Sequence, residues 1–419
     1  MIDQQRLGFS EKILHGIILL FFLTVPVYVL PSGGFQLVDI PIIFGMVLAS
    51  LVLNRELYDR SRLIVMLLAV YVSWTVLINI VYFVGRSDLF YMKSAIQLVF
   101  IVFMFAAFVV LLQRLILKKK GVLCIYAGLF LSLIPPFLVT GSYDTTDTEG
   151  VGGVSMRTAL SFNNPNQLAY FAILILAIFF LIRLYSRRFE FTRWQRIGTG
   201  FVAVAVWVMS HAFVFLSASR AGLICIGVLD CLIFWKLRRK VVIAGTLLIV
   251  LLLPAGVIFR NDLPQVDILV VQRLMMTDTE AAMSKRVGTR FFQSLASEYA
   301  AMFGSGGVSS NPKVIEVHNA FADMLLCYGM IGVAIYLFFL SAVAVPYLRF
   351  MRRYEDLYYL GILFAIMLYN VGHNGMRTRL YWVFLALWFA VTREVIRERS
   401  QEIESPSRAE RLVAADAPV

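Results

Sequence analysis

Charged residues are scarce in this chain of 419 residues. They make up 15% of the sequence, against about 25% in soluble domains. Apolar residues make up 60%, against about 45–50% in soluble domains, and the mean hydropathy is +0.80. A soluble core of this size cannot enclose that much apolar surface. The composition therefore excludes a water-soluble enzyme, a disordered protein and a fibrous repeat.

Potential metal ligands are also few, because the sequence contains only four cysteines and four histidines. The cysteines lie in apolar stretches without metal-ligand spacing, so we interpret them as small core residues. They are Cys124, Cys225, Cys231 and Cys327.

Long apolar runs, by contrast, are abundant. A helix needs about 20 mainly apolar residues to cross the hydrocarbon layer of a membrane. The sequence supplies about twelve such runs, which predict an all-α, polytopic integral membrane protein. The predicted spans are 13–30, 36–53, 63–84, 94–113, 121–140, 165–183, 197–217, 220–236, 241–259, 320–344, 357–370 and 379–396.

The spans divide the chain into four parts. Nine spans fall within residues 1–259 and three within 320–396, and a tail follows at 397–419. Residues 260–319 form the only long hydrophilic insertion. Its segment 280–303 carries apolar residues at three- and four-residue spacing, which predicts a helix that stops at the glycine-rich Gly304–Gly307.

Lysine and arginine outnumber aspartate and glutamate by 38 to 26, which gives a formal charge of +12. In a membrane protein such an excess marks the cytoplasmic loops, so we do not expect nucleic acid as a partner. The even-numbered loops and both tails hold most of these cations. We therefore expect both termini in the cytoplasm and the 260–319 loop on the outer side.

Seven cations on the predicted outer side lie near span ends or in clusters. Positive charge there opposes the usual bias, so we expect anionic partners for them. Arginine suits this role because its planar guanidinium pairs bidentately with phosphate oxygens. The seven are Arg157, Arg220, Lys285, Arg286, Arg290, Arg377 and Arg379.

Two outer histidines are candidates for function. His318 precedes the tenth span, where the basic loop and the start of the Arg220 span converge, and His373 lies near Arg377 and is expected to line the same cavity. Asn319 is either a substrate contact or the cap of span ten, and Asp323, one turn further on, is expected to face the cavity.

Several polar residues have structural interpretations instead. Asn164 and Pro165 make a good helix start, with Asn164 as the cap. His15 and His211 are expected to be packing residues within spans. Asp230, inside span eight, is expected to pair with Lys236 or with a neighbouring helix. The carboxylates of the outer loops are scattered without ligand spacing, so we expect neither a metal nor another cofactor.

Four motifs together carry a resemblance to a known family. They are Arg157 ahead of Asn-Pro-Asn166, Ser217-Ala-Ser-Arg220 at a span start, Ser284-Lys-Arg286 followed by Gly304-Ser-Gly306, and His318-Asn319. In their order and spacing they resemble the O-antigen ligase and O-antigen polymerase superfamily of bacterial envelope glycosyltransferases. The motifs cover roughly residues 155–345.

The resemblance implies a GT-C-like glycosyltransferase of the bacterial inner membrane, with its active site on the periplasmic side. Arg220 and Arg286 match the arginines held to bind the undecaprenyl pyrophosphate of the donor, and Arg157 matches a third basic position less closely. His318 matches the histidine proposed as base. Arg290 stands where the family often has tryptophan, so its phosphate-binding role is inferred from its charge alone.

These observations predict metal-independent, inverting transfer of a glycan to an acceptor hydroxyl, in polymerisation of O-antigen or exopolysaccharide. An O-antigen ligase would use the same donor but the lipid A–core of lipopolysaccharide as acceptor, and the motifs do not separate the two. A transporter of lipid-linked sugars is a third alternative. It is disfavoured because the sequence shows no internal repeat.

Overall fold

The computed structural model describes residues 2–28, 35–52, 55–139, 159–162, 164–217, 219–237, 298–306, 319–349, 351 and 357–404. The described residues form helices and their connections and include no strand, which confirms the all-α prediction. The longer helices are α1 (Ile2–Thr24), α2 (Asp39–Val52), α3 (Arg55–Arg86), α4 (Leu89–Ile116), α5 (Lys119–Leu131), α7 (Pro165–Tyr185), α8 (Arg193–Leu216), α9 (Arg220–Leu237), α14 (Ala320–Arg349), α15 (Leu357–Gly372) and α16 (Arg379–Glu404). Short helices are α6 (Pro135–Leu138), η2 (Ser186–Arg188), α13 (Glu298–Phe303) and η5 (Gly375–Arg377).

Among the described residues, six helical segments are long and apolar enough to cross a membrane. They lie in α3, α4, α5 with α6, α7 with η2, α8 and α14, and α2 and α15 are shorter apolar helices. Every predicted span except the ninth overlaps a helix. The ninth, 241–259, lies outside the described residues, as does most of the predicted loop helix, so the count of twelve stays a prediction.

Two predicted spans differ in detail from the helices found. Span 121–140 is divided, because α5 ends at Leu131 and Pro135 begins α6; proline has no N–H to continue the hydrogen-bond ladder. The apolar run 320–344 predicts one continuous helix, but α14 is broken at Gly329.

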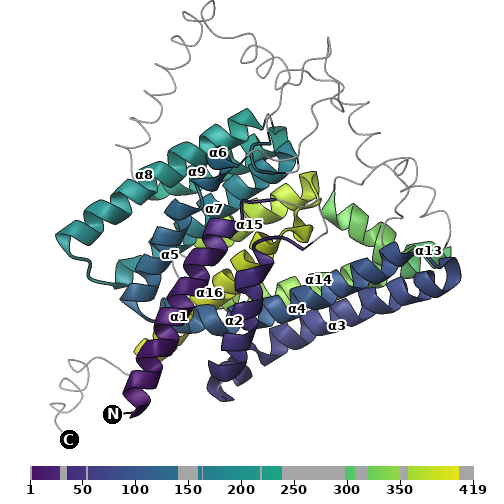
Figure 1. Cartoon of the computed structure of the whole chain (residues 1–419), viewed down its shortest axis with the longest axis horizontal. Helices are drawn as coiled ribbons and strands as arrows, with labels where there is room; N and C mark the ends of the chain where they lie inside the picture. The colour runs from purple at the N-terminus through teal and green to yellow at the C-terminus, as the bar shows by residue number, and fades with distance from the viewer. Residues whose placement is uncertain are drawn as a thin grey trace, which may run out of the picture.

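Two helices form the centre of the bundle. Residues 168–182 of α7 and 380–391 of α16 are buried on every side. Helices that are apolar all round belong in such a core. Figure 1 shows α3, α4 and α14 running together on one side of this centre, and α8 lying on the other side near α5 and α7.

The outer helices expose apolar faces. On α8 the exposed apolar side chains recur at three- and four-residue spacing, so they form a single stripe along the helix. They are Trp194, Ile197, Phe201, Val204 and Val208. A contiguous exposed apolar stripe of this kind needs a nonaqueous partner. Together with the long apolar helices, this stripe identifies the chain as a membrane protein.

One end of the bundle is basic, and we call it the basic end. It joins the start of α5, the end of α7, the first half of α1 and the C-terminal half of α16. Lys118 forms an ion pair with Glu11, and Arg188 lies 3.6 Å from the carboxylate of Glu394. At the opposite end, which we call the cavity end, α4, α7, α14 and α16 begin and α15 finishes.

The break in α14 lies toward the cavity end and is closed by a distant segment. Gly329 has φ 68° and ψ −175°, which interrupts the helical hydrogen bonds. The carbonyl oxygens of Leu326 and Cys327 accept hydrogen bonds at 2.9 Å from the amides of Ser305 and Gly306. Backbone groups inside a membrane must find partners within the protein, and the segment after α13 supplies them here.

Tight packing explains the glycines of this junction. Trp74 Nε1 donates to the carbonyl oxygen of Tyr328 at 3.0 Å. This hydrogen bond gives a partner to the last carbonyl before the break. A Cβ atom on Gly304 would lie 2.3 Å from the carbonyl oxygen of Cys327, and one on Gly329 would lie 2.1 Å from that of Met302. Gly304 has φ +84°, a conformation that glycine adopts without strain. The predicted helix stop is therefore confirmed, and its glycines also dock against α14.

Candidate functional site

A cavity of about 790 Å³ opens at the cavity end of the bundle. Its wall is formed by the first turns of α2, α4, α7, α14 and α16 and by the last turn of α15 with η5. Ligand pockets typically enclose about 300–1,000 Å³ and combine an aromatic lining with a few placed polar groups. Polar residues of the wall include Asp39, Lys93, Gln97, Asn166, Gln167, Asp323, His373, Asn374, Arg377 and Arg379, and aromatic residues include Tyr28, Tyr71, Tyr170, Tyr328, Tyr369 and Trp382.

One buried ion pair crosses this wall from α2 to α16. Arg379 donates from Nε to Oδ1 of Asp39 at 3.0 Å and from Nη2 to Oδ2 at 3.1 Å. The backbone amide of Gln36 also donates to Oδ2, at 2.8 Å. Asp39 is only 2% exposed. The bidentate pair joins residues 340 positions apart in the sequence and fixes the start of α16 against the start of α2.

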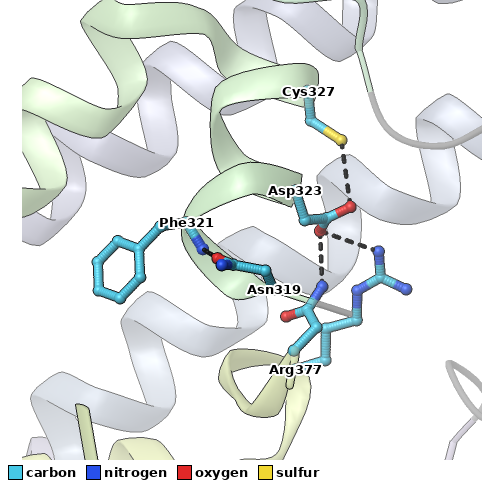
Figure 2. A network of polar contacts seen from close by, with 6 residues as sticks. Asn319, Phe321, Asp323, Cys327 and Arg377 are labelled. Carbon is cyan, nitrogen blue, oxygen red and sulfur yellow. Dashed lines mark hydrogen bonds and ion pairs between the residues drawn. The ribbon is translucent and has the colours of Figure 1, made fainter. Parts of the chain in front are cut away.

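A second acidic residue holds η5 against α14. Asp323 Oδ2 accepts hydrogen bonds from Asn374 Nδ2 at 2.6 Å and from Arg377 Nη2 at 3.2 Å. The thiol of Cys327, one turn later on α14, lies 3.8 Å from Oδ1. Figure 2 shows the carboxylate of Asp323 between Cys327 and the guanidinium of Arg377. The contacts join the first turn of α14 to the turn between α15 and α16.

Two asparagines at helix starts act as caps. Asn319 Oδ1 accepts from the amides of Phe321 and Ala322, both at 3.0 Å, and so caps α14. Asn164 Oδ1 accepts from the amide of Gln167 at 2.9 Å, and Pro165 takes the first position of α7. Both geometries satisfy helix N–H groups that have no partner inside the helix. The capping interpretations of Asn164 and Asn319 are therefore confirmed.

His373 lies directly after α15 and lines the cavity. The centroid of the His373 ring lies 5.2 Å from the centroid of the Tyr369 ring. The Tyr369 ring also stacks on the ring of Tyr170, with 4.5 Å between the two centroids. The hydroxyl of Tyr369 donates to the carbonyl of Asn166 at 2.8 Å. These contacts tie the end of α15 to the start of α7. Arg377 also lines the cavity, whereas substrate contact by either His373 or Arg377 stays a prediction.

Arg220 is the first residue of α9. It is absent from the described cavity wall, but its neighbour Ala221 packs closely on the end of α15, since a Cβ atom on Gly372 would lie 3.0 Å from that of Ala221. Gly372 directly precedes His373, so α9 begins beside the part of the cavity wall that contains His373. The other predicted site residues lie outside the described residues: Arg157, Arg286, Arg290 and His318.

The expectation that outer arginines have anionic partners is confirmed for Arg377 and Arg379. Their partners are carboxylates of the chain itself, Asp323 and Asp39. No local sequence signal pointed to Asp39, which lies 340 residues before its partner. Asp323 lies one turn beyond Asn319, and its predicted position facing the cavity is confirmed. Within the part of the chain that the structure describes, no three His, Cys, Asp or Glu residues cluster as metal ligands.

The interpretation of His211 as a packing residue is incomplete. Its Nε2 atom lies 2.8 Å from Oδ2 of Asp230 on α9, and its Nδ1 atom lies 2.8 Å from the carbonyl of Trp207. The indole of Trp207 donates to Oδ1 of Asp230 at 3.0 Å. The expected pairing of Asp230 with a neighbouring helix is confirmed. Burial of a carboxylate among apolar helices requires such polar partners.

The fold and the site define the class of the protein as a helical membrane protein with a polar cavity at the end of the bundle opposite to the basic end. Comparison of the chain with protein-family models and with curated proteins finds no match.

Proposed function

We propose that the chain is a glycosyltransferase of the bacterial inner membrane that moves a glycan from undecaprenyl pyrophosphate to an acceptor hydroxyl. The polymerisation of O-antigen or exopolysaccharide is the process we favour. The cavity carries this proposal, because it gathers carboxylate, amide, imidazole and tyrosine side chains in a bundle whose core is mainly apolar. Polar residues at such positions in membrane proteins mark substrate sites. The family resemblance of the four motifs supplies the reaction.

The charge distribution supports a periplasmic active site. Lys118, Lys119, Arg188 and Arg397 gather at the basic end of the bundle. Cytoplasmic segments carry the excess of Lys and Arg in inner-membrane proteins. With the basic end in the cytoplasm, both termini are cytoplasmic and the cavity faces the periplasm, where lipid-linked glycans are polymerised.

In this proposal the arginines stabilise the leaving group. As the bond between the anomeric carbon and the phosphate oxygen breaks, negative charge develops on the pyrophosphate. Arg220 and Arg286, with Arg157 or Arg290, supply fixed positive charge at that position, which is a major source of catalysis in enzymes. In the described cavity wall the carboxylates of Asp39 and Asp323 already pair with arginines. This pairing favours a metal-independent reaction.

His318 is the general base in this proposal. It directly precedes Asn319, the residue that caps α14. Its imidazole takes the proton of the acceptor hydroxyl while the hydroxyl oxygen bonds to the anomeric carbon. Histidine titrates near neutral pH and is suited to this role. Attack opposite the leaving group inverts the anomeric configuration in a single displacement.

The proposal is tested with purified protein in nanodiscs and a lipid-linked glycan extracted from a strain that lacks the protein. We expect release of undecaprenyl pyrophosphate and glycans of increasing length with donor alone, in the presence of EDTA. Release only after addition of lipid A–core identifies the ligase instead. Movement of the lipid without release, or activity that requires Mg²⁺, contradicts the proposed reaction.

A further inference from the structure

The two acid–arginine pairs of the cavity wall differ in how many of their carboxylate oxygens accept strong hydrogen bonds. Both oxygens of Asp39 accept strong hydrogen bonds, two from Arg379 and one from the Gln36 amide. Asp323 receives its two strong hydrogen bonds on Oδ2 alone. Among the described residues, Oδ1 of Asp323 has only the thiol of Cys327 at 3.8 Å. A thiol is a weak donor.

This carboxylate is held rigidly. Asp323 is 8% exposed, lies in the first turn of α14 and lines the cavity. Asn374 and Arg377 fix Oδ2 from the opposite side. The Oδ1 atom therefore remains as an acceptor of fixed position, and burial raises the cost of leaving it without a strong donor.

The side chain of Asn374 adds a complementary polar group beside this carboxylate, in contact with its other oxygen, Oδ2. One of its two amide N–H bonds is used by Asp323, and its carbonyl oxygen has no partner among the described residues. A carboxylate accepts only, whereas a carboxamide both donates and accepts. A sugar hydroxyl likewise both donates and accepts, so two neighbouring hydroxyls of one ring match this pair.

Charge argues against a phosphate at this position. Asp323 and Asp39 balance Arg377 and Arg379 within the same wall, and an anion placed beside Oδ1 would be repelled by it. An uncharged hydroxyl faces no such repulsion. Tyr328, which follows Cys327, also lines the cavity.

We infer that Asp323 Oδ1 and the Asn374 carboxamide form a subsite that binds two neighbouring hydroxyls of a sugar ring of the lipid-linked glycan. The inference rests on the proposed function and assigns the glycan, rather than its pyrophosphate, to the junction of α14 and η5. Asp323 contacts the substrate here and takes no part in bond breaking.

The subsite is tested by binding to nanodisc-embedded protein with two probes. One probe is undecaprenyl pyrophosphate without sugar, and the other is the glycan-bearing lipid extracted from a strain that lacks the protein. Asp323→Asn turns the free acceptor into a donor, and loss of a hydrogen bond to a charged group costs about 10- to 100-fold in affinity. We expect this loss for the glycan-bearing lipid and unchanged binding of the sugar-free lipid.

Asn374→Ala leaves the pairing of Asp323 with Arg377 in place, so it tests the subsite independently of that ion pair. We expect the same selective loss. Asp230→Asn is the matched control, because this carboxylate on α9 is not among the residues of the described cavity wall; monodisperse protein of this variant should bind both probes as the wild type does. Equal weakening of both probes in the Asp323 or Asn374 variant, or no weakening, overturns the subsite. Wild-type protein that binds neither probe overturns the proposed function itself.

Discussion

Substitution of Gly329 by alanine tests how the broken helix α14 is held. The φ of 68° and ψ of −175° at this residue belong to a region that glycine alone adopts freely. An added Cβ atom would lie 2.1 Å from the carbonyl oxygen of Met302 and 2.6 Å from the amide of Phe303. Both atoms belong to the backbone at the end of α13, so the end of α13 and the segment after it must move away from α14.

The expected cost has two sources, backbone strain and broken hydrogen bonds. Backbone strain at such a position costs about 1–3 kcal/mol. Displacement of the segment also removes the two amide hydrogen bonds to Leu326 and Cys327 and the bond from Ser305 Oγ to Leu326, each worth about 0.5–1.5 kcal/mol. We expect Gly329→Ala to lower the free energy of unfolding by about 3–7 kcal/mol.

The measurement is the fraction of monodisperse protein that remains after heating in detergent. Gly227→Ala on α9 is the matched control, since a Cβ atom there meets nothing within 4 Å. In a helix this change is expected to be neutral or to stabilise by up to about 1 kcal/mol. For a chain of 419 residues the unfolding entropy is about 0.9 kcal/mol/K, so the midpoint of Gly329→Ala should fall by about 3–8 °C. If the two variants lose monodisperse protein at the same temperature, the docking argument is wrong.

Three further predictions concern charged and polar groups. Arg379→Ala leaves the buried Asp39 carboxylate without its partner and should cost about 3–5 kcal/mol; the double variant with Asp39→Asn should be more stable on heating than Arg379→Ala alone. Asp230→Leu removes the acceptor of Trp207 and His211 and should cost about 1–3 kcal/mol, and unchanged thermal stability would contradict the role of this contact. His318→Ala should reduce turnover by about 10²–10⁴-fold with donor affinity retained; near-normal turnover in a donor-only assay would exclude His318 as the base.

Helix caps and helix stops were predictable because they depend on neighbouring residues. Asn164 precedes a proline and an apolar run, and the structure shows it capping α7. The glycines after residue 303 end α13 in the same local way. That Gly304 and Gly306 then dock on α14 was not predictable. Their partners lie more than 20 residues further along the chain, and only the packed bundle brings them together.

The sequence predicted that Arg377 and Arg379 have anionic partners, but it did not predict which residues these partners are. Positive charge at span ends indicated that anions would be near Arg377 and Arg379. The positions of Asp39 and Asp323 depend on how α2 and α14 pack against the turn before α16. The periodicity of the sequence does not contain this packing. His211 is the opposite case, since an apolar span suggested packing while the neighbouring helix supplied a carboxylate.

The amino-acid sequence was sufficient to predict a bundle of apolar helices with one basic end, because hydrocarbon accepts only long apolar segments whose backbone hydrogen bonds are satisfied internally. Composition and local spacing carry that information. The packed bundle was needed to show which polar side chains share the cavity, and that among the described residues Oδ1 of Asp323 has only a thiol as donor. Those outcomes depend on side-chain shape across helices distant in sequence, since helices in a membrane associate through close packing and specific hydrogen bonds.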